Sequence, residues 1–262
     1  MSRIHPTAVI DPNTVLDITA EVGAYSIIGP NVTIGSGTKV GPHVVIEGPT
    51  SIGRNNIFFQ FGSIGAAPQD KKYTGEPTRL EIGNGNTIRE FVTLNRGTTQ
   101  DVGITRLGNE NWIMAYAHVA HDCQIGNHTI IANNATLAGH VHVGDWALLG
   151  GFTTIHQFCR IGAHAMTAFT AAVSQDIPPF VTAAGNRAVP AGINSEGLRR
   201  HGFSNEQIMS IKRAYKLIYR SGLSLAEAEA AIEAEESKSS DSAEYLGMLR
   251  EFIASSTRGI IR

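Results

Sequence analysis

The chain is 262 residues long, 42% of its residues are hydrophobic and 17% are charged, and its formal net charge at pH 7 is −2. This composition is typical of a soluble globular protein, and so small a net charge argues against general attraction to nucleic acid or to an anionic membrane surface. Residues 1–6 contain no apolar signal region and no hydrophobic run approaches the length of a membrane span, so we expect neither feature.

A six-residue period of large apolar side chains begins at the N-terminus and continues without a slip to residue 64. This period is typical of a parallel β-helix, in which each hexad forms a short strand and a corner, and three hexads form one coil. The pattern therefore predicts a mainly β protein in which residues 18 apart lie one above another. The periodic positions are Ile4, Ile10, Leu16, Val22, Ile28, Ile34, Val40, Ile46, Ile52, Phe58 and Ile64.

Two insertions interrupt the period, at residues 66–81 and near residues 95–106. Insertions in solenoids often gather on one face and carry binding groups, although a tolerated surface loop is the alternative for either one. The first insertion is rich in charged and hydrogen-bonding side chains, which favours a functional role.

The period ends after Val173, and prolines at positions 178, 179 and 190 then break the pattern. We therefore predict two domains, a β-helix over residues 1–190 and a helical domain over residues 191–262. Capping boxes at Ser204 and Ser224 predict the starts of two helices, and a third is expected over about residues 243–254, after a polar loop at residues 238–241.

The two cysteines, Cys123 and Cys159, are 36 residues apart, which separates them by two coils or roughly 9–10 Å. That spacing exceeds the roughly 7 Å limit between the α-carbons of a disulfide. We expect two free thiols, as in the reducing cytosol, and hence a cytoplasmic protein.

His121 and Asp122 are the sharpest candidates for catalysis. Imidazole titrates near neutral pH and can act as a general base, while a carboxylate fixes its tautomer and stabilises the imidazolium form. Neighbouring residues of a strand point to opposite sides, so this pair needs a corner in the chain. Gly139 lies one coil above His121 and could offer its N–H to an oxyanion, and His140 lies above Asp122. The alternative to a catalytic role is that these residues only form a polar corner of the solenoid.

Four histidines gather in this part of the solenoid and weaken the explanation of a merely polar corner. They are His118, His121, His140 and His156. They could instead bind a metal, which needs three or four convergent ligands. Asp122 beside His121, and Gln157 one coil above Gly139, make a metal the less favoured interpretation, and we expect no metal and no cofactor.

A basic face is predicted on the first capped helix, where Lys212, Lys216 and Arg220 are spaced four residues apart. It is either a solvated helix face or a docking surface for an acidic partner.

Several segments together resemble one family. They are residues 69–79, 118–123, 137–141, 156–159 and 194–200, and the match extends to the tail at residues 256–262. Their combination is similar to the UDP-N-acetylglucosamine 3-O-acyltransferases, which begin lipid A synthesis. Competing interpretations are an acetyl-CoA-dependent transferase of the same fold, which would lack a carrier-docking helical domain, and a structural solenoid, which would show regular polar rows.

The resemblance implies a left-handed β-helix, a homotrimer with active sites between subunits, and transfer of an (R)-3-hydroxyacyl group from acyl carrier protein to the sugar 3-hydroxyl. By this match His121 is the general base, Asp122 its orienting partner and Gly139 the oxyanion donor, and the basic helix face meets the carrier protein. The implied nucleotide-sugar contacts are Gln69, Asp70, Lys72, His118, His140, His156, Gln157, Asn194, Glu196 and Arg200.

Three positions bear on specificity. Phe169 aligns with the family position that limits acyl length, where a bulky side chain shortens the acyl tail; burial inside the coil or at a subunit contact is the alternative. Asn95 and His201 depart from the family, which commonly has His and Arg there, and these changes affect local substrate contacts.

Overall fold

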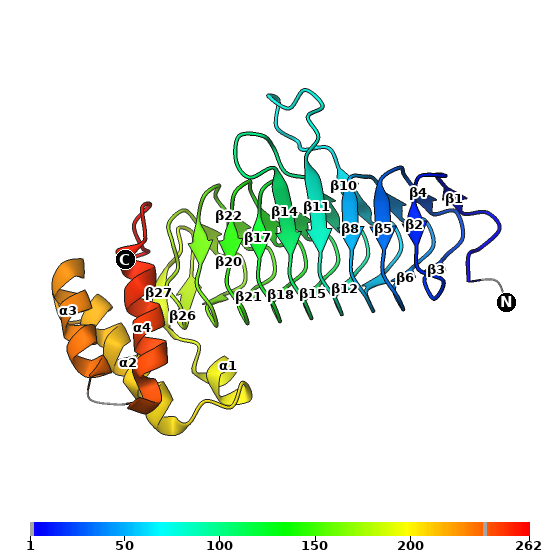
Figure 1. Ribbon diagram of the computed structural model, residues 1–262. Helices are drawn as coiled ribbons and strands as arrows, with labels where there is room; N and C mark the ends of the chain where they lie inside the picture. The colour runs from blue at the N-terminus through cyan, green and yellow to red at the C-terminus, as the bar shows by residue number, and fades with distance from the viewer. Residues whose placement is uncertain (1–2, 238–239) are drawn as a thin grey trace.

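A computed structural model describes residues 3–237 and 240–262 of the protein. It is an elongated left-handed parallel β-helix with a small group of helices at its C-terminal end, which confirms the predicted fold class (Figure 1). The short strands form three faces of nine, eight and ten strands, called here sheets 1, 2 and 3. No helix in the described ranges is both long and apolar enough to cross a membrane.

The strands recur in the order sheet 1, sheet 2, sheet 3 along the chain. Sheet 1 contains β1 (Val9–Ile10), β4 (Ile27–Ile28), β7 (Val45–Ile46), β10 (Ser63–Ala66), β13 (Thr93–Asn95), β16 (His118–Val119), β19 (Thr136–Leu137), β22 (Thr154–Ile155) and β25 (Ala172–Val173). Sheet 2 contains β2 (Val15–Leu16), β5 (Val32–Ile34), β8 (Thr50–Ile52), β11 (Arg79–Ile82), β14 (Ile104–Leu107), β17 (Gln124–Ile125), β20 (His142–Val143) and β23 (Arg160–Ile161). Sheet 3 contains β3 (Glu21–Val22), β6 (Lys39–Val40), β9 (Ile57–Phe58), β12 (Thr87–Ile88), β15 (Trp112–Ile113), β18 (Ile130–Ile131), β21 (Leu148–Leu149), β24 (Met166–Thr167), β26 (Val181–Ala184) and β27 (Val189–Ile193).

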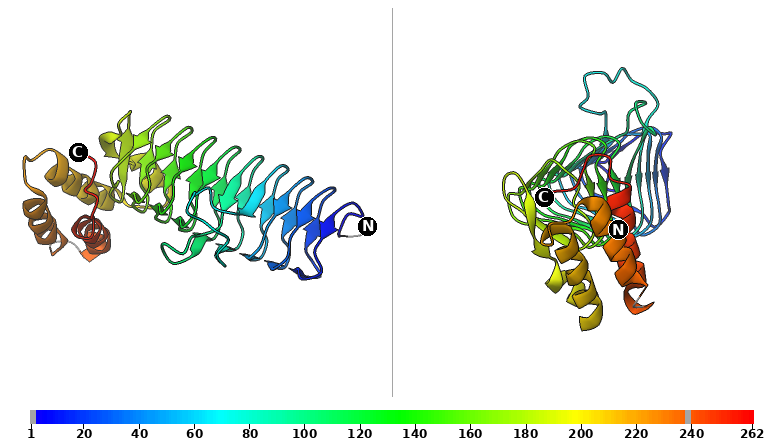
Figure 2. Two further views of the ribbon diagram at one scale, coloured as in Figure 1. Left: turned by 90° about the horizontal axis from the view of Figure 1, so that it is seen from above. Right: turned by 90° about the vertical axis from the view of Figure 1, so that its left-hand side faces the viewer.

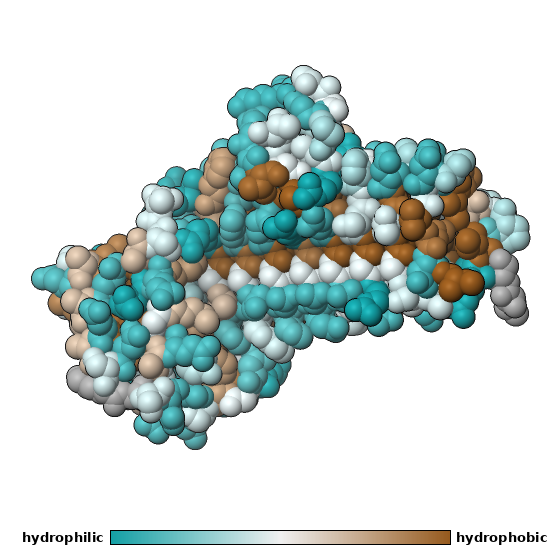
Figure 3. Space-filling model, viewed as in Figure 1, coloured by the Kyte–Doolittle hydropathy of each residue, from teal (hydrophilic) through white to brown (hydrophobic). Residues whose placement is uncertain are grey.

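The predicted 18-residue stacking is confirmed, since His118 pairs with Thr136, and Thr136 with Thr154. From Val22 onward the periodic apolar side chains fill the interior, where Ile64 and Leu137 are fully buried. Like residues therefore form rows along the solenoid, visible on its surface in Figure 3. One row is glycine because the coils approach closely: a β-carbon on Gly35 would lie 2.7 Å from the carbonyl carbon of Gly53.

The coils turn at three corners, and from Tyr25 onward most of these corners contain a residue in the left-handed region of backbone space. The first corner lies between sheets 3 and 1 and the third between sheets 2 and 3. The second corner, between sheets 1 and 2, turns at Asp122, His140 and Phe158, whose φ angles are 60°, 62° and 64°. Non-glycine residues rarely adopt this conformation, so the repeated corner rather than local preference imposes it.

Both insertions leave the solenoid at the second corner, where they stand out at the top of Figure 1. They cover residues 67–78, between β10 and β11, and residues 96–103, between β13 and β14. Both are shorter than predicted, because Ala66 belongs to β10 and residues 79–81 to β11, while Ile104–Leu107 pairs with β11 as a strand. The Arg96 guanidinium ties the loops together, donating to the Gly65 carbonyl at 2.6 Å and the Tyr73 hydroxyl at 3.3 Å.

The helical end contains α1 (Ser195–Arg200), α2 (Asn205–Tyr219), α3 (Leu225–Glu236) and α4 (Ser240–Ala254), gathered beside the last coils (Figure 2). Both predicted capping boxes are confirmed at Ser204 and Ser224. The predicted polar loop is wrong for Ser240 and Asp241, which open α4, since an acidic residue suits the first turn of a helix. Residues 238 and 239 lie outside the described residues.

The antiparallel pair of β26 and β27 was not predicted and leads the chain from the last coils to α1. The proposed division of the chain at residue 190 stays a prediction. Both cysteines are free, as expected. Both are also buried, which raises the pKa of Cys123 to about 12 and that of Cys159 to about 11.

Candidate active site

His121 and Asp122 form a direct pair at the second corner. The Nδ1 atom of His121 lies 2.9 Å from Oδ2 of Asp122. The left-handed backbone of Asp122 turns its side chain back toward the preceding residue, which is the corner that the sequence required. A carboxylate only accepts hydrogen bonds, so the His121 proton sits on Nδ1 and the Nε2 lone pair is left free.

The Asp122 carboxylate is fully buried and held by Thr98 of the second insertion. The Thr98 N–H donates to Oδ1 at 2.9 Å, and the Thr98 hydroxyl donates to Oδ2 at 2.6 Å. Burial acts to raise the pKa of Asp122, but the hydrogen bonds from His121 and Thr98 outweigh it and hold the pKa below its ordinary value. The carboxylate is therefore ionised when it orients the imidazole.

Gly139 lies directly against the imidazole of His121, as the stacking predicted. A methyl group at this position would lie 2.7 Å from Nε2 and 3.0 Å from Nδ1, so no larger residue fits without moving the ring. Within residues 3–237 and 240–262, the Gly139 N–H donates to no acceptor. An unsatisfied N–H beside a basic nitrogen is the arrangement that stabilises an oxyanion during acyl transfer.

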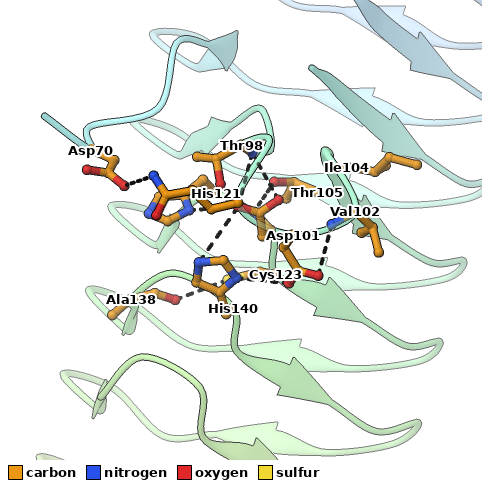
Figure 4. Close-up of polar contacts among 12 residues, drawn as sticks. Asp70, Thr98, Asp101, Val102, Ile104, Thr105, His121, Cys123, Ala138 and His140 are labelled. Atoms are coloured by element: carbon orange, nitrogen blue, oxygen red, sulfur yellow. Dashed lines mark hydrogen bonds and ion pairs between the residues drawn. The ribbon is translucent and has the colours of Figure 1, made fainter. Parts of the chain in front are cut away.

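His140, the residue after Gly139, lies beside His121 and Asp101 (Figure 4). Its ring stacks on Phe158 with centroids 4.4 Å apart and meets His121 edge-on at 5.0 Å. Its Nδ1 lies 2.9 Å from Oδ2 of Asp101, in the second insertion, and its Nε2 lies 3.9 Å from Oδ2 of Asp122. The site therefore contains two histidines, each facing a carboxylate through Nδ1.

The same groups are the candidate metal ligands. Ligand atoms of His121, Asp122 and His140 lie within 4.8 Å of one another, the only such cluster in the described part of the chain. The Asp122 carboxylate already accepts hydrogen bonds from Thr98 on both of its oxygens and faces His121 through Oδ2. A carboxylate engaged in this way suits the orientation of an imidazole better than metal coordination, in which ligand lone pairs converge on one point.

Other predicted residues lie close to this corner. His118 in β16 contacts the Thr93 hydroxyl through Nδ1 at 2.7 Å, and burial and the nearby His121 lower its pKa. Asp70 is half-buried on the first insertion. The hydrogen bond from the Lys72 N–H and the nearby His121 lower the pKa of Asp70, although partial desolvation acts in the opposite direction. Four further predicted residues are exposed: Gln69, Lys72, His156 and Gln157.

The predicted residues on α1 lie elsewhere. Asn194 caps α1 and donates to the carbonyl of His164, on the third corner, at 3.0 Å. Glu196 pairs with Arg200 at 3.1 Å on the exposed side of α1. Figure 1 shows α1 on the side of the solenoid opposite the insertions. One chain therefore does not bring these three residues to His121.

The two departures from the family are both structural contacts. His201 ends α1 and places its Nδ1 3.1 Å from Nδ1 of His164 while packing on Trp146. Asn95 is buried and donates to the Ala67 carbonyl at 2.9 Å, which supports the first insertion.

Phe169 is 66% exposed on the first corner, with its ring 5.4 Å from that of Phe152. Burial inside the coil is therefore ruled out for this side chain. Lys212 and Lys216 are exposed on α2, whose opposite side is buried, and Arg220 is exposed directly after the last residue of that helix.

Thr98 and Asp101 are site residues that the sequence did not reveal. They lie in the second insertion, outside the six-residue period, so no stacking rule places them. The only signal for them was the insertion itself. Thr98 lies 24 residues and Asp101 lies 21 residues before Asp122.

Comparison with known proteins first defines the class. Residues 104–139 match the family model described as bacterial transferase hexapeptide (six repeats), which makes the solenoid a hexapeptide-repeat transferase. Residues 176–261 match a second model, described as UDP N-acetylglucosamine O-acyltransferase, domain 2.

Relatives and solved structures then define the family. The chain is 76% identical to the acyl-[acyl-carrier-protein]–UDP-N-acetylglucosamine O-acyltransferase of Herminiimonas arsenicoxydans and 74% identical to that of a Janthinobacterium strain, over 100% of each chain. The solved UDP-N-acetylglucosamine O-acyltransferase of Moraxella catarrhalis is 43% identical with a TM-score of 0.96, covering 99% of this chain and 100% of that one. LpxA of Acinetobacter baumannii is 47% identical with a TM-score of 0.94, covering 99% of each. The chain belongs to this O-acyltransferase family.

Proposed function

We propose that the protein transfers an (R)-3-hydroxyacyl group from acyl carrier protein to the 3-hydroxyl of UDP-N-acetylglucosamine, the first step of lipid A synthesis. The observation that carries this proposal is the His121 imidazole, oriented by Asp122 and lying against the unsatisfied Gly139 N–H. The names of the relatives contain the same acceptor and the same carrier.

In the proposed reaction, Nε2 of His121 removes the proton of the sugar hydroxyl as its oxygen attacks the thioester carbonyl. The Gly139 N–H stabilises the oxyanion that forms, and buried Asp122 stabilises the imidazolium. Collapse of this intermediate breaks the carbon–sulfur bond, and His121 returns its proton to the departing thiolate. The ester and the free carrier thiol are then the products.

The nucleotide sugar is proposed to span two chains. Gln69, Asp70, Lys72, His118, His140, His156 and Gln157 are proposed to contact it from the chain that supplies His121. Because α1 lies on the opposite side of its own solenoid, Asn194, Glu196 and Arg200 are proposed to come from a neighbouring copy. This supports a homotrimer with sites between subunits.

The acidic carrier is proposed to dock on the exposed basic face of α2, formed by Lys212, Lys216 and Arg220. Rim charges of this kind mainly raise the association rate. The division into a solenoid over residues 1–190 and a helical domain over residues 191–262, and a cytoplasmic location, are part of the same proposal.

The decisive experiment is the His121→Ala variant, assayed with UDP-N-acetylglucosamine and 3-hydroxyacyl carrier protein. We expect kcat to fall by a factor on the order of 10²–10⁴, since a general base is lost, with unchanged assembly. His5→Ala, an exposed histidine far from the site, is the matched control. Near-normal turnover by a folded His121→Ala variant would refute the assignment of His121 as the general base. Activity lost on prolonged dialysis against EDTA would favour the metal alternative.

A further inference from the structure

The second insertion reaches both histidines of the site from one short segment. Thr98 donates to Asp122, which holds His121, and three residues later Asp101 meets Nδ1 of His140 at 2.9 Å. The Val102 N–H in turn donates to Oδ1 of Asp101 at 2.9 Å, so one carboxylate oxygen is held by the loop and the other by the histidine. Figure 4 shows this carboxylate beside the His140 ring.

We propose that Asp101 is a positioning residue for acyl transfer, which keeps the His140 proton on Nδ1 and directs Nε2 into the active site. The inference rests on the proposed function and extends it to a residue outside the repeat pattern. A carboxylate accepts hydrogen bonds but does not donate them, so its contact with Nδ1 selects the tautomer that carries hydrogen there.

Stacking alone does not provide this selection. The Phe158 ring lies 11° from parallel with His140 and fixes the plane of the imidazole. A half-turn of the imidazole about its Cβ–Cγ bond would return the ring to the same plane, with Nδ1 exchanged for Cδ2 and Nε2 for Cε1, and would keep the stacking contact. The hydrogen bond to Asp101 distinguishes the two orientations. Phe158 therefore fixes the plane of the His140 ring, and Asp101 fixes which nitrogen lies on which side.

Nε2 of His140 consequently faces the reacting groups. It lies 3.9 Å from Oδ2 of Asp122, and the ring lies edge-on to His121 at 5.0 Å. A substrate hydroxyl or carbonyl beside Nε2 of His121 is therefore within reach of this second imidazole. The charged and titratable groups that face His140 are Asp101, His121, Asp122 and His142, which follows on β20.

The competing role for Asp101 is a structural latch for the insertion. Both roles predict some loss of stability when the contact is removed, so activity alone does not separate them. The tautomer of His140 and its coupling to Asp101 do separate them, because a latch does not depend on which imidazole nitrogen is protonated.

The test uses full-length protein labelled with ¹⁵N-histidine and compares Asp101→Asn, Asp101→Glu and Val102→Ala. The amide of Asp101→Asn has nearly the shape of the carboxylate but can also donate, which removes the preference for the Nδ1–H tautomer. We expect the His140 signals to show Nδ1–H in the wild type and a mixture in Asp101→Asn. We expect Asp101→Glu to retain Nδ1–H in part. Val102→Ala changes an exposed neighbour in the same loop and should behave as wild type.

Kinetics supply the second readout. Asp101→Asn should lower kcat about tenfold or more, with a smaller change in the Michaelis constant for the sugar nucleotide, and Asp101→Glu should restore part of the loss. If Asp101 acts through His140, adding Asp101→Asn to His140→Ala should cause no further loss.

Additive losses in that double variant, or an unchanged His140 tautomer in Asp101→Asn, would overturn the proposal. Failure of the proposed function is a different result. A wild-type protein without transferase activity would refute the proposed reaction, while the tautomer spectra would still report whether Asp101 orients His140.

Discussion

His121 and Gly139 are matched in shape, and the match explains why this coil carries glycine above the histidine. The imidazole occupies the space that any β-carbon at position 139 would fill, 2.7 Å from Nε2. Gly139 therefore both carries the unsatisfied N–H and leaves room for the His121 ring. The placement of the general base and that of the oxyanion donor both depend on the contact between the His121 ring and the Gly139 backbone.

Gly139→Ala should consequently impair catalysis more than folding. The added methyl group must displace the His121 ring, and a shift of about 1 Å at a reacting group can lower turnover by roughly 10²-fold. The check is kcat together with the midpoint of thermal unfolding. Gly62→Ala is the control, because its methyl group would meet only ordinary contacts of 3.6 Å or more. Normal kcat in Gly139→Ala would contradict the assignment.

Phe169 is expected to set the length of the acyl chain. Its ring is exposed, lies over Gly151 and meets the Phe152 ring edge-on, so one side of it is available to contact an acyl chain. Phe169→Gly should shift selection toward longer 3-hydroxyacyl donors. The measurement is competition between carrier proteins of graded acyl length, with products identified by mass spectrometry. Phe61→Gly, another exposed ring on the same corner, should leave the preference unchanged. If Phe169→Gly keeps the wild-type preference for acyl length, Phe169 is not the residue that limits it.

Sequence reasoning succeeded at residue scale where the repeat applies. The 18-residue rule placed Gly139 on His121 and His140 above Asp122, and the structure confirms both. It could not place Thr98 or Asp101, since they lie in an insertion whose path depends on tertiary contacts such as those of Arg96. Side chains that approach a site from outside a repeat have no period to reveal them.

At the scale of elements, α1 is attached to the solenoid through a histidine pair. Nδ1 of His164 lies 3.1 Å from Nδ1 of His201, and Asn194 holds the His164 carbonyl. Burial, and then the neighbouring His201, lower the pKa of His164 to about 4, although Asp145 acts in the opposite direction. Burial also lowers the pKa of His201. Both histidines are therefore neutral when α1 is docked at neutral pH.

This arrangement predicts loss of stability in mild acid. An unfolded histidine titrates near pH 6.5, so the unfolded chain binds protons that the folded pair excludes as the pH falls from about 6.5 toward 4. The contribution of the pair to stability is complete above this window and declines within it. Thermal unfolding midpoints between pH 7.5 and 4.5 should therefore fall less steeply in His164→Gln than in wild type. His5→Gln should keep the wild-type slope, and an equal slope in His164→Gln would contradict the explanation.

The helical elements show what local signals determine. The capping boxes at Ser204 and Ser224 identified α2 and α3 because side chain and backbone satisfy each other within four residues. The pair of β26 and β27 escaped prediction because it lacks the six-residue period and contains Pro190. Its pairing depends on contacts with the last coil, through β24 and β26.

At the scale of the whole molecule, the proposed site is divided between two sides of an elongated solenoid. His121 lies at the second corner, whereas Arg200 lies on α1, which is attached at the third corner through Asn194. The two sides meet only if one copy places α1 against the second corner of another. Contacts of this head-to-tail kind close into a ring, as a trimer requires.

Mixed assemblies test this division directly. His121→Ala and Arg200→Ala should each be nearly inactive alone, yet the mixed assemblies formed on co-expression should regain about a third of wild-type activity, because a closed ring of three that contains both variants has one interface in three with both wild-type residues. Mixing His121→Ala with Asp122→Asn is the matched control. These two residues act within one chain, so every site of that mixture carries one defect and should stay inactive. The measurement is activity of purified mixed assemblies, separated by different affinity tags on the two chains. If the first mixture is as inactive as its parents, the site does not draw His121 and Arg200 from different copies.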